Sequence, residues 1–205
     1  MANLKSIFMK FRDQAKSLIK QYKLEALTDV ALFILITVLI HFVWRYWANT
    51  LNYMPITDFI ADSQSWLSDV VFVQSIWFIQ HVLSIPITII EETNTMYFAN
   101  KGYMAINQSC SGLKQMMQFV LLIMLIRGPW KRKWWFILLG ILIVHLTNLF
   151  RVTGLSVVIT TAPEYWNFSH DNIFRPIFYV VIFSLWVWWV ERISMVKNPK
   201  KSVSA

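Results

Sequence analysis

The chain has 205 residues, of which 57% are hydrophobic and 15% charged, and its mean hydropathy is +0.49. This composition excludes an ordinary soluble domain and indicates an integral membrane protein. A single cysteine excludes an internal disulfide, and no Cys/His set has the spacing of a zinc site, so we expect neither a metal nor another cofactor.

The first 47 residues predict two helices of different kinds. Residues 1–26 carry apolar side chains at helical spacing and six Lys/Arg on the other positions. This pattern is typical of an interfacial amphipathic helix, and its charged region is too long for a cleavable signal peptide. The uncharged run over 30–44 then predicts an uncleaved first transmembrane helix over residues 27–47.

Residues 48–109 differ from both. The segment 62–90 is apolar but contains polar residues and a proline, each of which is costly at mid-bilayer. We therefore expect it to lie on the extracytoplasmic face as an amphipathic or re-entrant helix. The stretch "TMYFANKGYMAI" (95–106) predicts two short strands around Asn100-Lys101-Gly102, which is a hairpin signal.

Three further apolar runs, at 115–126, 134–150 and 176–190, are separated by the basic turn "RGPWKRK" (127–133) and by a polar outer loop. With 62–90 outside, the chain has four spans, and 14 of its 19 Lys/Arg lie on the cytoplasmic side. A fifth span would place the basic turn outside, so the positive-inside rule favours four. The scattered basic residues then face anionic lipid headgroups, and we expect no nucleic-acid partner.

Three reactive side chains are predicted at one level of this bundle. Cys110 and Arg151 each lie 17 residues from the cytoplasmic end of their own helix. That separation is about 26 Å, close to the hydrocarbon thickness of about 30 Å. His170 lies in the outer loop or at the start of the last helix. All three therefore meet at the extracytoplasmic boundary.

Cys110 is predicted at the N-terminus of a transmembrane helix, where free N–H groups and the helix dipole favour a thiolate. Ser111 and Gly112 would leave room for a substrate backbone to approach. The alternative is that the cysteine is a small buried hydrophobe, but its polar neighbours "INQS" argue against that.

Arg151 would stabilise the thiolate and the oxyanion of an acyl-transfer intermediate, and Asn148, one turn earlier, would orient it. His170 is the candidate general base and acid, supported by Asp171 or by backbone carbonyls. Lys114 either lines the site or extends its ammonium group toward the membrane surface. Each residue also has a duller explanation, as an interfacial arginine or an ordinary surface histidine.

Taken together, "CSGLK" at the head of one helix, "NLFR" at the outer end of the next and "HD" before the last resemble the exosortase/archaeosortase family. The resemblance covers roughly residues 62–192, and the chain's size is similar to the compact bacterial branch called exosortase F. It implies that Cys110 is the nucleophile, Arg151 the family's arginine and His170 the acid/base. Lys114 departs from the arginine common at that position.

The resemblance also implies a reaction. A cysteine transpeptidase of this kind removes a C-terminal sorting signal, consisting of a short motif, a transmembrane helix and a basic cluster, from exported proteins. The thioester that forms is resolved by an amine acceptor, which the sequence does not identify. Two alternatives stay open: a protease that only hydrolyses, and a non-enzymatic membrane assembly subunit. The predicted spans contain few polar residues at mid-bilayer, which argues against a transport path.

The expected fold class is therefore an all-α integral membrane protein with a short β-hairpin before the cysteine. A single membrane domain covers 1–205, with the catalytic core over 62–192 and a cytoplasmic basic tail over 193–205. The expected location is the bacterial cytoplasmic (inner) membrane, with both termini cytoplasmic and the lipid bilayer and exported proteins as partners.

Overall fold

The structure, a computed structural model, describes residues 25–50, 55–126 and 128–194. The predicted interfacial helix over 1–26 and the basic tail over 193–205 lie almost entirely outside these residues. The chain divides into two compact units, residues 1–43 and 44–205, and each is described by itself. Helix α2 (Glu25–Thr50) spans the boundary between them and contains the predicted first transmembrane segment.

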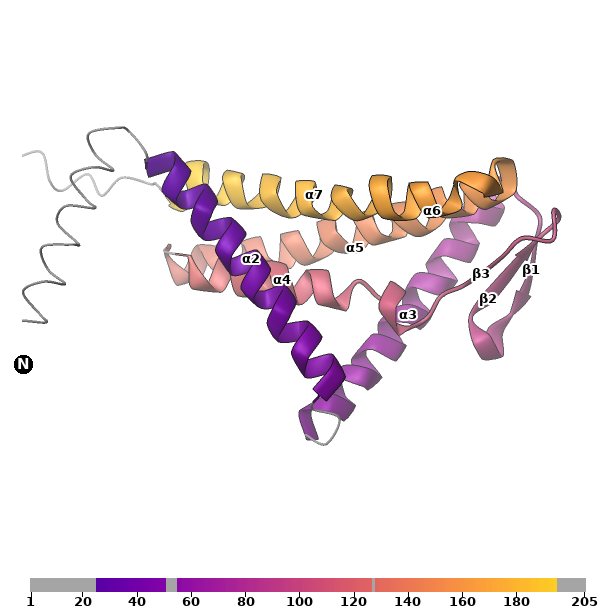
Figure 1. The fold of residues 1–205 in the computed structure, drawn as a ribbon, viewed down its shortest axis with the longest axis horizontal. Coiled ribbons are helices and arrows are strands. Elements are labelled where there is room, and N and C mark those ends of the chain that lie inside the picture. The colour runs from indigo at the N-terminus through magenta and orange to yellow at the C-terminus, as the bar shows by residue number, and fades with distance from the viewer. Residues whose placement is uncertain (1–24, 51–54, 127, 195–205) are drawn as a thin grey trace, which may run out of the picture. The chain divides into compact units, whose positions relative to one another are not determined.

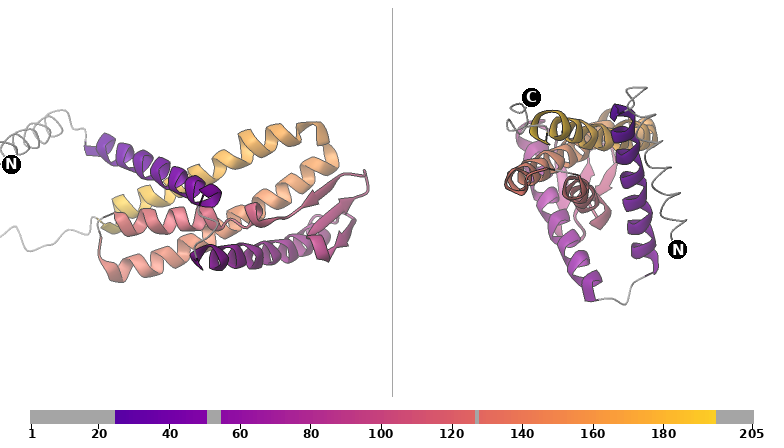
Figure 2. Two further views of the ribbon diagram at one scale, coloured as in Figure 1. Left: turned by 60° about the horizontal axis from the view of Figure 1, so that its bottom comes forward. Right: turned by 90° about the vertical axis from the view of Figure 1, so that its left-hand side faces the viewer.

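Three apolar helices of the second unit lie side by side: α4 (Leu113–Leu125), α5 (Trp130–Thr161) and α7 (Arg175–Trp188) (Figures 1 and 2). A glycine allows α4 and α5 to approach closely. A Cβ added to Gly140 would lie only 2.0 Å from the ring of Phe119. Small residues at such contacts allow close packing where lipid provides no hydrophobic driving force between helices.

This contact gives a prediction for stability. Gly140→Ala is expected to destabilise the protein by about 1–3 kcal/mol, because the added methyl group overlaps the Phe119 ring and forces α4 away from α5. The thermal unfolding midpoint in detergent should fall by several degrees. Leu142→Ala, at an exposed position of the same helix, is the control and should change the midpoint little. Equal midpoints for Gly140→Ala and the wild type would contradict this packing.

The basic turn between α4 and α5 is held by a buried lysine. Lys133 is only 3% exposed, and its Nζ donates hydrogen bonds to the carbonyls of Met124 (2.9 Å) and Ile126 (2.5 Å). These carbonyls belong to the last turn of α4, which has no further helical N–H groups to bond with. The side chain thus fixes the end of α4 against the start of α5.

Among the described residues, two helices are long and apolar enough to cross a membrane: Trp130–Thr161, and the continuous helical stretch Pro163–Arg192. The second stretch combines η3 (Pro163–Tyr165), α6 (Trp166–Phe168), the π-helix η4 (Ser169–Phe174), α7 and the start of η5 (Trp189–Ser194). Val30–Tyr46 and Leu113–Leu125 are shorter apolar helices. The number of four spans stays a prediction.

The segment predicted as a helix over 62–90 is only partly helical. Helix α3 runs from Pro55 to His81, earlier at both ends than predicted. It is followed by Ser84 with a positive φ of 53° and then by Pro86, which has no N–H to continue a helix. The β-branched "ITII" that follows forms strand β1 (Ile87–Ile90) instead.

Strands β1, β2 (Thr95–Phe98) and β3 (Tyr103–Ala105) form an antiparallel sheet in the order β1-β2-β3. The 3₁₀ turn η1 (Glu91–Thr93) joins the first two strands. The stretch 99–102 joins β2 to β3. Gly102 is needed there for a close approach, because a Cβ would lie 2.5 Å from the Ile159 side chain of α5.

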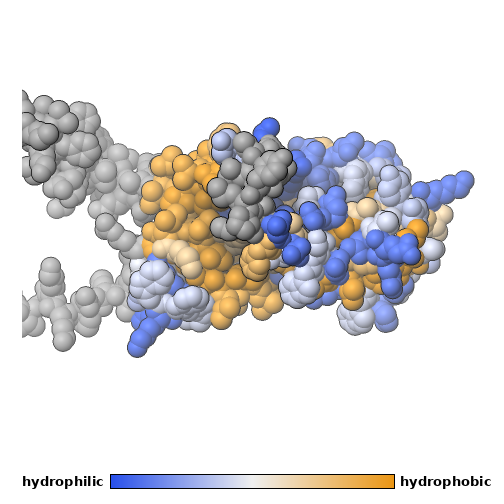
Figure 3. Space-filling model, turned by 90° about the horizontal axis from the view of Figure 1, so that it is seen from below, coloured by the Kyte–Doolittle hydropathy of each residue, from blue (hydrophilic) through white to orange (hydrophobic). Residues whose placement is uncertain are grey.

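One face of the sheet packs on α3 and α5 in a single apolar cluster. Its buried members come from α3, from β2 and β3 with the adjoining Ile106, from α5 and from η4: Val71, Phe72, Ile79, Met96, Phe98, Met104, Ile106, Val152, Leu155, Ile159 and Phe174. This burial explains why α5 does not end near Arg151 as predicted but continues for about 15 Å beyond it. Hydrophilic side chains gather over the end of the face that carries the sheet, and hydrophobic ones away from it (Figure 3).

The polar residues that interrupt α3 bind other elements of the protein. Asp69 Oδ1 accepts a hydrogen bond from Asn94 Nδ2 at 2.6 Å, which joins α3 to the sheet. Gln74 Oε1 lies 2.7 Å from His145 Nε2, which joins α3 to α5. His145 is thus a helix–helix contact, as its place inside an apolar run indicates.

Candidate active site

Cys110 lies just before a helix rather than on its first turn. It is the last residue of the 3₁₀ turn η2 (Gln108–Cys110), and α4 begins at Leu113. The two are separated by Gly112, whose φ of 77° breaks the helical path. The predicted place at a helix N-terminus is therefore corrected to a separate turn that leads into the helix.

Side chains from three elements fix this turn. Asn107 Oδ1 accepts the Ser109 N–H at 3.1 Å within the turn itself. Gln108 Nε2 donates to Ser65 Oγ of α3 at 2.8 Å. From α5, Asn148 Nδ2 donates to the Cys110 carbonyl at 2.7 Å. The backbone of the cysteine is thus held from both neighbouring helices.

Two expectations about the neighbours of Cys110 are wrong. Asn148 was expected to orient Arg151, but it is fully buried and binds the Cys110 carbonyl instead. Ser111 and Gly112 do not open space for a substrate. Ser111 is 1% exposed and its Oγ accepts the Leu113 N–H, while a Cβ on Gly112 would lie 3.1 Å from Asn148 Nδ2.

The Asn148 contact leads to a testable expectation. Asn148→Ala leaves the Cys110 carbonyl without this donor, which costs about 1–3 kcal/mol and frees the turn to move. The rate at which a maleimide alkylates Cys110, the only cysteine, should differ from that of the wild type. Any activity at this thiol should fall about tenfold, which corresponds to the loss of one hydrogen bond. Thr147→Ala is the matched control, since Thr147 Oγ1 bonds only within its own helix, to Ile143 O. Unchanged labelling in Asn148→Ala would show that the contact does not position the thiol.

A chain of charged and polar side chains joins α5 to the last helical stretch. Arg151 Nη2 lies 2.8 Å from His170 Nε2, and His170 Nδ1 lies 2.7 Å from Asp171 Oδ1. Arg175 Nη1 lies 3.1 Å from the same carboxylate oxygen. A guanidinium can only donate, so His170 Nε2 is the acceptor and the imidazole is neutral, with its proton on Nδ1 donated to Asp171.

The π-helix η4 and a glycine bring His170 to α5. A Cβ on Gly154 would lie 2.5 Å from the Phe174 ring, so the glycine lets η4 contact α5 directly. Trp166 stacks on His170, with ring centroids 6.0 Å apart and an interplanar angle of 21°. The single-turn π-helical widening is a feature found often at functional sites.

Cys110 and Arg151 are electrostatic neighbours, with the thiol acting on the guanidinium. Cys110 is half-buried, and no hydrogen bond joins its sulfur to another residue of the described part of the chain. Arg151 Nε is buried and likewise has no partner among these residues. Within the described residues, the thiol therefore has no hydrogen bond, and the guanidinium on which it acts keeps one donor, Nε, without a partner.

Two residues of the cluster were not singled out from the sequence. Arg175 completes the chain through Asp171, and Trp166 covers the His170 ring. Both lie four residues from their partners, and this i,i+4 spacing could have identified them once a helix was assumed there. Lys114 is half-buried and lies within the electrostatic reach of Arg175.

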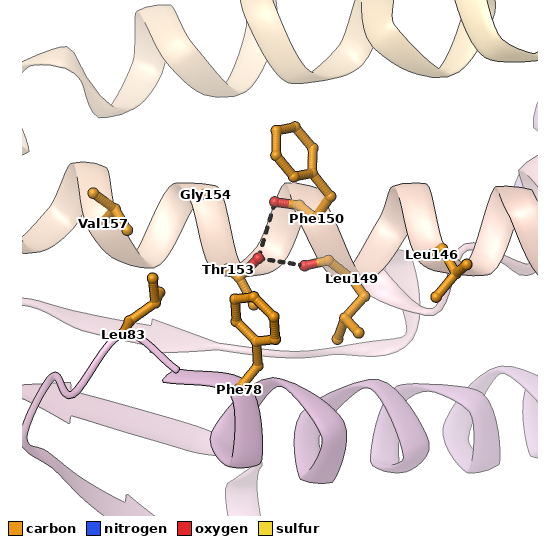
Figure 4. A pocket seen from close by; sticks show the side chains of 8 residues that line it. All are labelled: Phe78, Leu83, Leu146, Leu149, Phe150, Thr153, Gly154 and Val157. Carbon is orange, nitrogen blue, oxygen red and sulfur yellow. Dashed lines mark hydrogen bonds between the residues drawn. The ribbon is translucent and has the colours of Figure 1, made fainter. Parts of the chain in front are cut away.

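An apolar hollow of about 360 Å³ lies between the end of α3 and another face of α5 (Figure 4). Its lining includes one polar side chain, Thr153, whose hydroxyl bonds back to the carbonyls of Leu149 (2.9 Å) and Phe150 (3.2 Å). At about 100° per residue, this face points away from Asn148. The hollow offers no group for acid/base or nucleophilic chemistry, so the cluster around Cys110 is the candidate site.

Comparison with protein families matches residues 25–189 to the family model described as transmembrane exosortase. No curated protein matches the sequence, and no solved structure matches it. The matched range includes α2 as well as the whole cluster of Cys110, Arg151 and His170.

Proposed function

Because this chain belongs to the transmembrane exosortase family, we propose that it is a cysteine transpeptidase that removes the C-terminal sorting signal of exported proteins. Two observations support the proposal: Arg151 contacts His170, and the Cys110 side chain acts electrostatically on the same guanidinium. Nucleophile, cation and base in one cluster are the parts that acyl transfer requires.

The proposed reaction begins with proton transfer from the Cys110 thiol to His170 Nε2. In the resting state this nitrogen accepts from Arg151, so protonation ends that bond and frees the Arg151 N–H. The Cys110 sulfur attacks the scissile carbonyl, and the freed guanidinium donates to the oxygen that becomes negative. Asp171, bonded to Nδ1, stabilises the imidazolium in the meantime.

The second half of the reaction returns the enzyme to its starting state. The C–N bond breaks, and His170 gives its proton to the departing amine. The product is a thioester between the exported protein and Cys110. An acceptor amine then attacks this carbonyl, loses a proton to His170 and releases the thiolate, which is reprotonated.

The proposed setting is the bacterial cytoplasmic membrane, with the site on the extracytoplasmic face and four spans. The charge distribution supports this orientation, because most basic residues lie beyond the helix ends remote from Cys110. A substrate helix beside the bundle would then present its outer end at the level of the thiol. Hydrolysis without transfer is the second candidate, since both reactions share the thioester.

The test is the chemical identity of the product. A reporter ending in a motif, transmembrane helix and basic cluster, taken from an exported protein of the same cell, is incubated with the enzyme in membranes. Mass spectrometry of the released fragment should show a C-terminal amide. Hydroxylamine present during the reaction should attack the thioester in place of the acceptor amine and give a C-terminal hydroxamate instead. A free carboxylate alone would identify a hydrolase. No cleavage of any such exported protein by folded enzyme would overturn the proposal.

A further inference from the structure

Strand β3 presents a free backbone edge. Phe98 N–H bonds to Gly102 O at 2.8 Å and Ile106 N–H to Asn94 O at 2.9 Å, on either side of the Met96↔Met104 pair. Because N–H and C=O groups alternate in direction along a strand, those of Tyr103 and Ala105 point away from β2. Among the described residues they have no hydrogen-bond partner, and both side chains are exposed.

This edge is rigidly connected to the proposed nucleophile. At its start, Asn100 Nδ2 donates to Ile159 O of α5 at 2.6 Å. At its end, Ile106 is buried, and Cys110 is held to α5 through Asn148. Cys110 comes only five positions after Ala105, so the Cα atoms of these two residues lie within about 17 Å of each other even if that stretch were fully extended.

The opposite edge of the sheet has no such direct connection to the cysteine. Strand β1 forms that edge, and its Ile89 lines a hollow of about 330 Å³ between the sheet and α3. It leads back along the chain to α3 and not to the cysteine. Both edges can accept an extended peptide, but only β3 continues directly into the site.

We infer that the free edge of β3 binds the stretch of substrate immediately before the scissile bond, as an added strand. The inference rests on the proposed function. An extended peptide obtains affinity from main-chain hydrogen bonds to an exposed edge, and specificity from alternate side chains. The stacked Tyr97 and Tyr103, 5.9 Å apart, lie beside the edge on the solvent face and contact those side chains.

The direction of the added strand follows from the topology. The C-terminal end of β3 leads to Cys110. In the proposed orientation, Cys110 lies at the membrane surface, so β3 runs toward the membrane. A substrate whose transmembrane helix follows the cleavage site also runs toward the membrane. The two strands are therefore parallel, and the residues in contact with β3 lie within about five positions before the scissile bond.

Cysteine cross-linking tests this arrangement without requiring catalysis. Cys110→Ala leaves a cysteine-free enzyme, into which Ala105→Cys is introduced. Single cysteines are placed in turn along the reporter before its cleavage site, using a reporter that the wild type processes. We expect disulfides at every second reporter position. Thr88→Cys, exposed on β1 and on the same face, is the matched control and should give none.

A second measurement removes one N–H of the edge. Ala105→Pro deletes an outward N–H and leaves the bonds to β2 in place, as proline tolerates at an edge. Processing should fall about three- to tenfold, the value of one hydrogen bond. Ala105→Val retains the N–H and is expected to process the reporter about three- to tenfold faster than Ala105→Pro. An unchanged maleimide-labelling rate of Cys110 in both variants shows that the turn remains folded.

The outcomes separate this inference from the proposed function. Strand addition would be overturned, with catalysis left intact, by any of three results. These are no cross-links from position 105, equally strong cross-links from position 88, and cross-links that do not alternate along the reporter. If Cys110→Ala still processes the reporter, the proposed function fails instead. If Ala105→Pro and Ala105→Val both process like the wild type, the outward N–H does not bind substrate and the inference fails.

Discussion

Replacing Cys110 with alanine is expected to reduce processing of a sorting-signal reporter at least a thousandfold, to the level of membranes without the enzyme. The reason is chemical, because without the sulfur no thioester forms and the remaining groups only polarise the peptide. The decay of the full-length reporter, measured by its mobility on a gel in co-expressing cells and in isolated membranes, gives the rate.

The neighbouring serine is the control for this substitution. Ser109 lies in the same exposed turn, and its Oγ donates to Asn107 Oδ1 at 2.5 Å. Ser109→Ala should retain most of the processing, because the Asn107 contact to the Ser109 N–H remains. Equal levels of both variants in the membrane exclude a folding defect. Normal processing by Cys110→Ala would show that the cysteine only fills space.

The contacts of the reactive residues could not be predicted from the sequence. Hydropathy and helix rise predict one depth for Cys110 and Arg151, because both quantities depend on local sequence alone. The Arg151–His170 hydrogen bond depends on how closely η4 approaches α5. That approach is set by the Gly154–Phe174 contact, a tertiary feature that no local pattern reveals.

The errors in the helix ends have the same origin. Arg151 was expected at the outer end of its helix because the apolar run ends there, and charge usually marks a membrane boundary. The ten residues that follow stay helical because Val152, Leu155 and Ile159 are buried against the sheet and α3. Packing against the sheet and α3 thus extends a helix that hydropathy alone would end.

The polar residues of α3 show when such an inference still works. Asp69 and Gln74 were interpreted as groups too costly for a lipid-exposed span. In the structure both bind protein partners, one in the sheet and one on α5. The polar residues indicated that one face of this helix is not exposed to lipid, although the partners that they bind could not be read from the sequence.

Arg151 is the second residue whose loss should nearly abolish the reaction. In Arg151→Ala, processing should fall about a hundred- to a thousandfold, the size of effect seen when a donor to a developing oxyanion is removed. Arg151 and Cys110 interact electrostatically, so removal of the guanidinium should also slow alkylation of the resting enzyme by a small uncharged reagent. A residue that only supported the fold would not change this second rate in a correctly inserted protein.

The lysine variant separates charge from geometry. Arg151→Lys retains the positive charge, so Cys110 alkylation should recover substantially. The lysine ammonium lacks the planar fork that holds an N–H on His170 Nε2 in the resting state and presents it to the oxyanion after His170 is protonated. Processing should therefore stay at least about tenfold below the wild type. Arg132→Ala, at an exposed position near the other end of α5, should leave both rates unchanged.

Full processing by Arg151→Lys would show that Arg151 contributes only its charge. Full processing by Arg151→Ala would remove it from the mechanism. The expected result, in which alkylation recovers and processing does not, would mean that the reaction requires the donor geometry of the guanidinium as well as its charge.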